Sequence, residues 1–147
     1  MAPIVSSVEI ARPPTEVFEY LTDPSHLPEW QESVVSVQGE RPHTVGSTVI
    51  ITRRVGRMER TMPSELMELT PPSSWAVRTP SGPIRGGVHG TVEPVNDGER
   101  SRVTIAVDLH GHGIGRILMP LIVRRQVEKE MPRNMKKLKD RLESEAP

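Results

Sequence analysis

Two groups of residues in this chain have types and spacings that could form a functional site: one could bind a metal, and the other could form an ion pair. His110-Gly111-His112 sets two imidazoles two residues apart, as some metal sites do, and Arg124 and Glu128 stand four residues apart, as in a helical ion pair. A metal site needs three or four convergent ligands, and no third ligand stands at a fixed spacing from the two histidines. We therefore interpret His110–His112 as a turn and predict neither a metal nor a cofactor.

Three charged residues are candidates for a role inside a pocket. Glu68 alternates with Leu66 and is predicted to share the inner face of its strand. Arg124 and Glu128 fall near the apolar stripe of a predicted helix and can pair there. A buried pair could orient a polar ligand group, and a buried carboxylate with a raised pKa could act as a general acid or base. Alternatively, all three lie at the margin of the stripe in water.

Two glycine-rich stretches, RGGVHG at residues 85–90 and GHGIG at residues 111–115, resemble phosphate-binding loops. A Rossmann or P-loop site needs a strand, a glycine loop and a helix in that order within a parallel unit. Neither stretch has those neighbours, so we reject both. The chain contains no cysteine, which excludes disulfides, zinc ribbons and thiol catalysis.

The composition is that of a small globular protein. The 147 residues correspond to a single domain, 1–147, with 35% hydrophobic and 26% charged side chains. The N-terminus lacks the pattern of a signal peptide, and no apolar run approaches the ~20 residues of a membrane span. We predict a cytoplasmic protein without membrane insertion. Residues 116–147 hold nine Lys/Arg and five Asp/Glu, which we interpret as a solvated helix face rather than a nucleic-acid surface.

Alternating apolar residues predict an antiparallel sheet. The first strand is Ile4–Ile10, and Pro63 indicates that a later strand is at an edge, bulged or broken there. Asn96-Asp97-Gly98 predicts a hairpin turn between the last two strands, because these residues tolerate positive φ. The other strands are expected near residues 33–38, 47–55, 60–70, 75–79, 84–95 and 103–109.

Prolines mark two short helices after the first strand. Pro13-Pro14 begins a helix over residues 15–21, and Asp23-Pro24 caps a second one that ends near Trp30. Phe18 and Trp30 are expected to be the apolar side chains that dock this pair of helices onto the sheet.

A long C-terminal helix is predicted over residues 115–143, with a kink at Pro132. One helix with one apolar stripe must lie on the concave face of a curved sheet. Gly86, Gly87 and Gly90 are expected to deepen the bend and to leave unfilled volume, so we expect a cavity. The stripe consists of Ile117, Leu121, Val127, Met131, Met135, Leu138 and Leu142.

Three stretches in this order resemble the START/Bet v 1-like (SRPBCC) superfamily, and within it the polyketide cyclase/dehydrase-like branch. They are PPTEVFEYLTDPSHLPEW after the first strand, ELTPPSSWAV at Glu68–Val77, and MKKLKDRLES at Met135–Ser144. The resemblance covers nearly the whole chain. It implies an α+β helix-grip fold, in which an antiparallel curved sheet of about six or seven strands wraps around the long C-terminal helix, with two short helices after the first strand. It implies no catalytic residue, because the superfamily shares no catalytic motif.

The resemblance implies a pocket for a hydrophobic ligand. Our leading interpretation is the binding of a hydrophobic or aromatic small molecule, lipids included, between the sheet and the helix of a monomer or homodimer. One alternative is a cofactor-free enzyme of the polyketide cyclase or dehydratase type, and another is a protein-interaction module with a filled core. Whether the chain is an enzyme stays open. The candidate ligand-binding residues are Leu21, Trp30, Leu66, Glu68, Trp75, Val88, Val103, Ile105, Val107, Leu121, Arg124, Glu128, Met131 and Met135.

Overall fold

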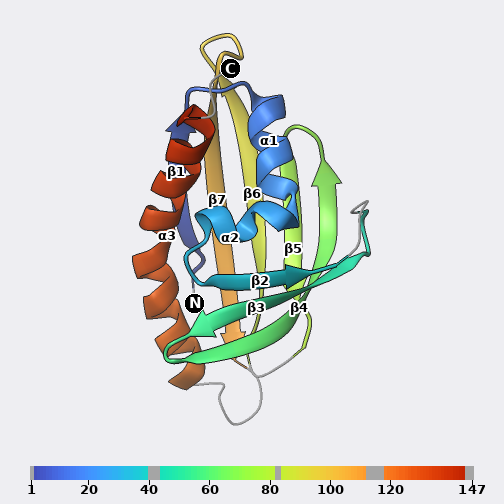
Figure 1. The fold of residues 1–147 in the computed structure, drawn as a ribbon, viewed down its shortest axis with the longest axis vertical. Coiled ribbons are helices and arrows are strands. Elements are labelled where there is room, and N and C mark those ends of the chain that lie inside the picture. Colours follow the sequence, from blue (N-terminus) through green and yellow to red (C-terminus); the bar gives the residue numbers. More distant parts are fainter. Residues whose placement is uncertain (1, 40–43, 82–83, 112–117, 145–147) are drawn as a thin grey trace.

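A computed structural model describes residues 2–39, 44–81, 84–111 and 118–144 (Figure 1). The strands are β1 (Ile4–Ile10), β2 (Val34–Gln38), β3 (Thr48–Val55), β4 (Met58–Thr70), β5 (Ser74–Thr79), β6 (Ile84–Val95) and β7 (Arg100–Gly111). The helices are α1 (Pro14–Thr22), the 3-10 helix η1 (Pro24–His26), α2 (Leu27–Trp30) and α3 (Leu118–Ser144). None of these helices is long and apolar enough to cross a membrane.

The seven strands form one antiparallel sheet in the order β1-β7-β6-β5-β4-β3-β2. All neighbouring strands except β1 and β7 are consecutive in the chain, so hairpins build most of the sheet. In Figure 1 the sheet curls around α3, which lies beside β1, while β2, β3 and the first part of β4 run across the direction of β5, β6 and β7. This arrangement confirms the predicted helix-grip fold.

The strand register gathers apolar side chains on the face toward α3. Ile4, Val107, Val88, Val77 and Leu66 are successive partners across β1, β7, β6, β5 and β4. Because side chains alternate along a strand, a row of partners shares one face of the sheet. The predicted β6–β7 turn is confirmed, with positive φ at residues 96–98.

Strand β4 accommodates Pro63 without a break. Pro63 pairs in register with Ile50 of β3, whereas β5 pairs with β4 only from Glu65 onward. The proline therefore lies where β4 runs past the end of β5, and its missing N–H is tolerated at what is locally an edge. The irregularity in this strand lies further on, between Leu66 and Glu68.

The two short helices dock through aromatic residues, as predicted. Phe18 and Trp30 are both buried, and the Phe18 ring packs edge-on against Trp75 of β5, with the ring centroids 6.2 Å apart. Asp23 caps η1 by accepting a hydrogen bond from the Ser25 N–H at 3.0 Å. Helices α1 and α2 therefore cover one end of the concave face.

Helix α3 is anchored at both ends to opposite sides of the sheet. Glu143 accepts a hydrogen bond from the Ala11 N–H at 2.8 Å, just after β1. Gln126 accepts from the Gly56 N–H at 2.9 Å and donates to the Arg54 carbonyl at 2.8 Å, at the β3–β4 hairpin. The helix continues through Pro132 to Ser144, and residues 115–117, where the helix was predicted to begin, lie outside the described residues.

The glycines of β6 have two different roles: two of them line a cavity, and the third allows an aromatic ring to pack against the strand. Gly86 and Gly87 line a cavity, described below. Gly90 does not, because the indole ring of Trp75 lies directly over its Cα and occupies the place of a side chain. The expectation that Gly90 leaves unfilled volume is therefore wrong, and this glycine is needed for close packing.

We expect Gly90→Ala to destabilise the protein by about 1–3 kcal/mol, because the new methyl group overlaps the Trp75 ring. Gly87→Ala is the matched control, since a methyl group there meets only the Val77 carbonyl oxygen at 3.4 Å. Urea unfolding of both variants measures the difference. Equal stabilities would show that Trp75 moves freely and does not depend on Gly90.

Candidate ligand-binding cavity

A cavity of about 580 Å³ lies between α3 and the inner face of the sheet. This volume is within the range of ~300–1,000 Å³ that is usual for small-molecule sites. Its walls come from α1, α2, strands β3 to β7 and α3. The apolar part of the wall includes Leu27, Met62, Val77, Leu109, Val123 and Val127, together with most of the predicted apolar residues.

Eight of the predicted ligand-binding residues line this cavity. They come from three strands and three helical segments that are far apart in the sequence, and the fold brings them together. As ligand contacts they stay predictions. They are Leu21, Trp30, Trp75, Val88, Ile105, Val107, Met131 and Met135.

The other six do not line it. Leu66 lines a second, smaller cavity of about 80 Å³, and Val103 is fully buried in the core. Leu121 is 47% exposed at the surface. The remaining three are Glu68, Arg124 and Glu128, which lie outside the cavity.

A β-bulge explains the position of Glu68. Leu66 pairs with Val77, but the next register pair is Glu68 with Ala76, so Met67 is an extra residue in β4. An extra residue reverses the alternation of the side chains that follow it. Glu68 consequently shares the outer face with Ala76, where it accepts a hydrogen bond from the Ser74 hydroxyl. The prediction that it shares a face with Leu66 is wrong.

Helix rotation explains the position of Leu121. Six residues separate it from Val127, and at about 100° per residue this turns Leu121 away from the stripe. Val123, four residues before Val127, occupies the cavity-facing position instead. Arg124 and Glu128 do pair as predicted, at 2.9 Å, but they do so at the surface.

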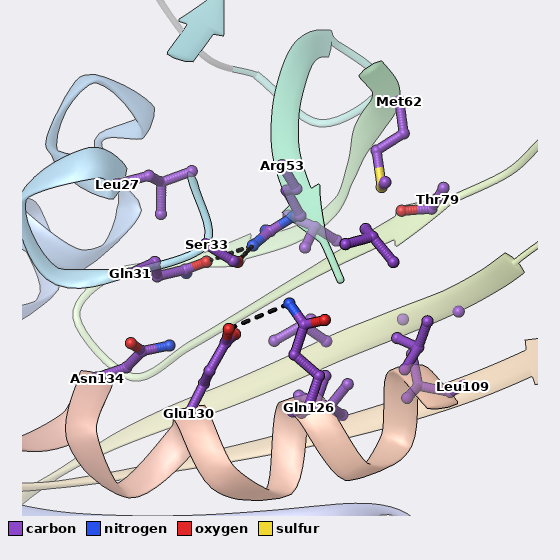
Figure 2. A pocket seen from close by; sticks show the side chains of 18 of the residues that line it. Leu27, Gln31, Ser33, Arg53, Met62, Thr79, Leu109, Gln126, Glu130 and Asn134 are labelled. Atoms are coloured by element: carbon purple, nitrogen blue, oxygen red, sulfur yellow. Dashed lines mark hydrogen bonds between the residues drawn. The ribbon is translucent and has the colours of Figure 1, made fainter. Parts of the chain in front are cut away.

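Polar residues that the sequence patterns did not single out form one side of the cavity. Figure 2 shows Gln126 and Glu130 rising from α3 toward Arg53 on β3, with Gln31 and Ser33 beside its guanidinium. The sequence did contain a signal for the inward position of Arg53. It alternates with Val49 and Ile51 on the same strand, and both of these apolar residues are buried. The polar residues around Arg53 are Gln31, Ser33, Gln126, Glu130 and Asn134. The cavity is also lined elsewhere by other polar residues, namely Arg54, Glu59, Arg60, Thr61, Arg78, Thr79, Ser81, Arg85 and Asp108.

Arg53 is held in place by two side chains. Its Nη1 donates to Gln31 Oε1 at 2.8 Å and to Ser33 Oγ at 3.3 Å. Burial lowers the pKa of Arg53, and the charge of Glu130 opposes that shift. A guanidinium nevertheless stays protonated in proteins, so Arg53 places a positive charge in the cavity wall.

Glu130 faces Arg53 from the opposite wall. Its Oε1 accepts a hydrogen bond from Gln126 Nε2 at 3.1 Å. Burial raises the pKa of Glu130, and the charge of Glu32 adds to the increase, while Gln126, Arg133 and Arg53 act against it. The side chain therefore keeps its proton to a higher pH than an exposed glutamate does.

The family of the chain follows from its sequence as a whole. The family model described as polyketide cyclase / dehydrase and lipid transport matches residues 1–143. The chain belongs to this family. This confirms the resemblance to the polyketide cyclase/dehydrase-like branch of the START/Bet v 1-like superfamily. No curated protein sequence matches the chain.

Solved structures show the same fold at low sequence identity. The Zhui aromatase/cyclase from Streptomyces sp. R1128 has a TM-score of 0.82 at 15% identity, over 96% of this chain and 93% of that one. A START superfamily protein from Mycobacterium smegmatis has a TM-score of 0.80 at 11% identity, over 99% and 100%. A protein from Thermus thermophilus has a TM-score of 0.80 at 15% identity, over 99% of both chains. Identities this low support the fold alone.

Among the described residues, the histidines of this polyketide cyclase / dehydrase and lipid transport family member do not form a metal-binding cluster. His26 stacks on Tyr20, with ring centroids 4.3 Å apart, and His89 projects from the outer face toward Glu68. In the described ranges, no three His, Asp or Glu side chains are placed to hold a metal ion. His110 and Gly111 belong to β7 and pair with Arg85 and Ile84 of β6, so the interpretation of these two residues as a turn is wrong. His112 lies outside the described ranges.

We expect Glu130→Gln to stabilise the protein increasingly as the pH rises from about 4 to about 8. The folded pKa of Glu130 is raised, so wild-type stability is lost as the pH rises from the unfolded pKa through the folded one. Glutamine does not titrate and escapes this loss. Thermal unfolding at several pH values measures the difference in Tm between the variant and the wild type.

Glu128→Gln, on the solvent side of the same helix, controls for removing one charge from α3. The same pH trend in both variants would assign the effect to the overall charge of the helix and not to the burial of Glu130.

Proposed function

We propose that this chain binds a hydrophobic or aromatic small molecule in the cavity between α3 and the sheet. The observation that carries this proposal is the cavity itself, with a volume of about 580 Å³ and a largely apolar wall. Burial of apolar ligand surface in such a site contributes roughly 25 cal/mol per Å². A filled core would leave no such volume, so the structure does not favour the protein-interaction alternative.

The residues of the wall suit a flat or flexible apolar ligand. Trp30 and Trp75 supply large, rigid surfaces, and both are held by packing. Met131 and Met135 from α3 have flexible, polarizable side chains that adapt to differently shaped partners. We expect the protein to act as a monomer or homodimer, without a nucleic-acid partner.

A second candidate function is cyclisation or dehydration of a polyketide. Glu130 favours it, because a carboxylic acid whose pKa is raised by burial in a cavity wall is a candidate general acid or base. The cavity would hold a reactive chain folded, and proximity would supply much of the rate. Turnover of a poly-β-ketone that Glu130→Gln abolishes, with binding of apolar probes intact, would favour this function over simple binding.

The binding proposal predicts that the neutral fluorescent probe N-phenyl-1-naphthylamine binds with one-to-one stoichiometry. Val107→Trp should weaken its binding at least about tenfold, because the indole fills the cavity that Val107 lines. Fluorescence titration measures both affinities, and circular dichroism checks that the variant keeps its fold.

Val5→Trp is the matched control, because Val5 is exposed on the outer face of β1, one residue away from the partner of Val107. It should bind the probe as the wild type does. Equal loss in both variants, or no binding to the wild type, would contradict a binding site in the cavity.

A further inference from the structure

We propose, on the basis of the proposed binding function, that the natural ligand carries an anionic oxygen group and that Arg53 receives it. A carboxylate, a phenolate and an enolate share this chemistry. The ligand class is then an apolar, ring-sized molecule with one acidic oxygen group, and not a neutral hydrocarbon or sterol-like molecule.

The first support is that most hydrogen-bond donors of Arg53 are unused. A guanidinium has five N–H donors, and only Nη1 of Arg53 has acceptors among the described residues, namely Gln31 and Ser33. In that part of the chain, Trp30 Nε1 is the one enclosed side-chain polar atom without a partner. The free Arg53 nitrogens are therefore accessible, and the space that Arg53 lines is the cavity.

The second support is the geometry of the donors that remain. Gln31 and Ser33 bind the Nη1 corner and fix the plane of the guanidinium. The Nε–H and one Nη2–H lie parallel along the opposite edge of that plane. Two parallel donors on one edge match the two oxygens of a carboxylate or the oxygens of a chelated enolate. The edge that the protein leaves open is thus one that binds anions in a bidentate way.

The third support is the absence of a close countercharge. Among the described residues, no carboxylate lies within 4.0 Å of the Arg53 guanidinium. Glu130 is the acid that acts on Arg53 through its charge, and it is hydrogen-bonded to Gln126 instead. A charge taken out of water needs a partner. An anionic ligand would provide the negative charge that the protein does not place next to Arg53.

The remainder of the cavity defines the other part of the ligand. Figure 2 shows Met62, Thr79 and Leu109 on the side of the cavity away from Gln31 and Ser33. Val88 and Val107 continue the apolar wall across the sheet. Other arginines also line the cavity, but the guanidinium of Arg53 is fixed by two side chains. The ligand should therefore place its anionic group at Arg53 and its apolar body along the rest of the wall.

A matched pair of probes tests this inference. 1-Anilinonaphthalene-8-sulfonate is N-phenyl-1-naphthylamine with one added sulfonate, so the two share an aromatic body and differ in the anionic group. Wild-type protein should prefer the sulfonate. Arg53→Gln should lower the ratio of sulfonate affinity to neutral-probe affinity about ten- to a hundredfold, as expected for a lost charged hydrogen bond.

Arg57→Gln is the control for this experiment, because Arg57 is exposed at the β3–β4 turn and lies outside the cavity wall. It removes the same charge and should change neither affinity. If Arg53→Gln leaves the ratio of the two affinities unchanged, Arg53 does not receive an anionic group and the inference is wrong. If the wild type binds neither probe, the proposed function fails and the inference falls with it.

A measurement on the wild type covers the case in which Arg53→Gln does not fold. A preference for the sulfonate that arises at Arg53 should persist between about 50 and about 500 mM NaCl, because salt screens buried pairs much less than surface ones. Loss of the preference at the higher salt concentration would assign it to surface arginines and overturn the inference.

Discussion

One geometric constraint shapes this protein: a single helix has to cover a seven-stranded sheet. Strands stand about 4.8 Å apart, so the flat sheet would be about 29 Å wide, whereas a helix is about 10 Å across. The sheet must therefore curl until both of its sides reach α3. Glu143 contacts the end of β1 and Gln126 contacts the β3–β4 hairpin, which joins the helix to both sides. The residual volume under the curl is the cavity.

The same constraint divides the apolar core. The larger cluster, which contains Val17, Val103 and Leu138, packs α1 and the C-terminal half of α3 onto the sheet. A smaller cluster of Val34, Val49 and Ile51 lies under β2 and β3. Leu27 of α2 packs against both clusters. The large cavity is lined by residues of the larger cluster together with Arg53 and Glu130, whereas Val49 and Ile51 of the smaller cluster line the smaller cavity.

The fold was predictable from the sequence because it depends on repeated patterns. Alternation over Ile4–Ile10 and residues 103–109, the Asn96–Gly98 turn and the proline-marked short helices each report a local preference that the tertiary structure keeps. The apolar part of the site was predictable for the same reason. Trp75, Val88 and Ile105 face inward because alternation places them there.

The polar part of the site was predicted poorly, for two physical reasons. A bulge at Met67 moves Glu68 to the outer face, and no residue type marks a bulge of this kind unambiguously. On the helix, the six-residue step from Leu121 to Val127 in the predicted stripe does not fit the helical period. The prediction therefore selected Leu121 and Arg124, whereas Val123 and Gln126, two residues further on, line the cavity. Arg53 was overlooked because a charged residue after the inward-facing Val49 and Ile51 suggests that the buried part of the strand has ended. In the structure Arg53 continues on the same face and lines the cavity.

The position of Arg53 shows how function and stability oppose each other at this site. Replacing a buried charge by an apolar side chain of similar volume is often neutral or stabilising, and the neighbouring Ile51 shows that this face of β3 accepts apolar residues. A protein that needed only a stable core would have no use for a guanidinium here. Gln31 and Ser33 orient the guanidinium without neutralising it, and burial favours the neutral form of Glu130 across the cavity. The arrangement leaves the charge of Arg53 without a close carboxylate partner, which disfavours the empty protein and becomes favourable when an anionic group enters.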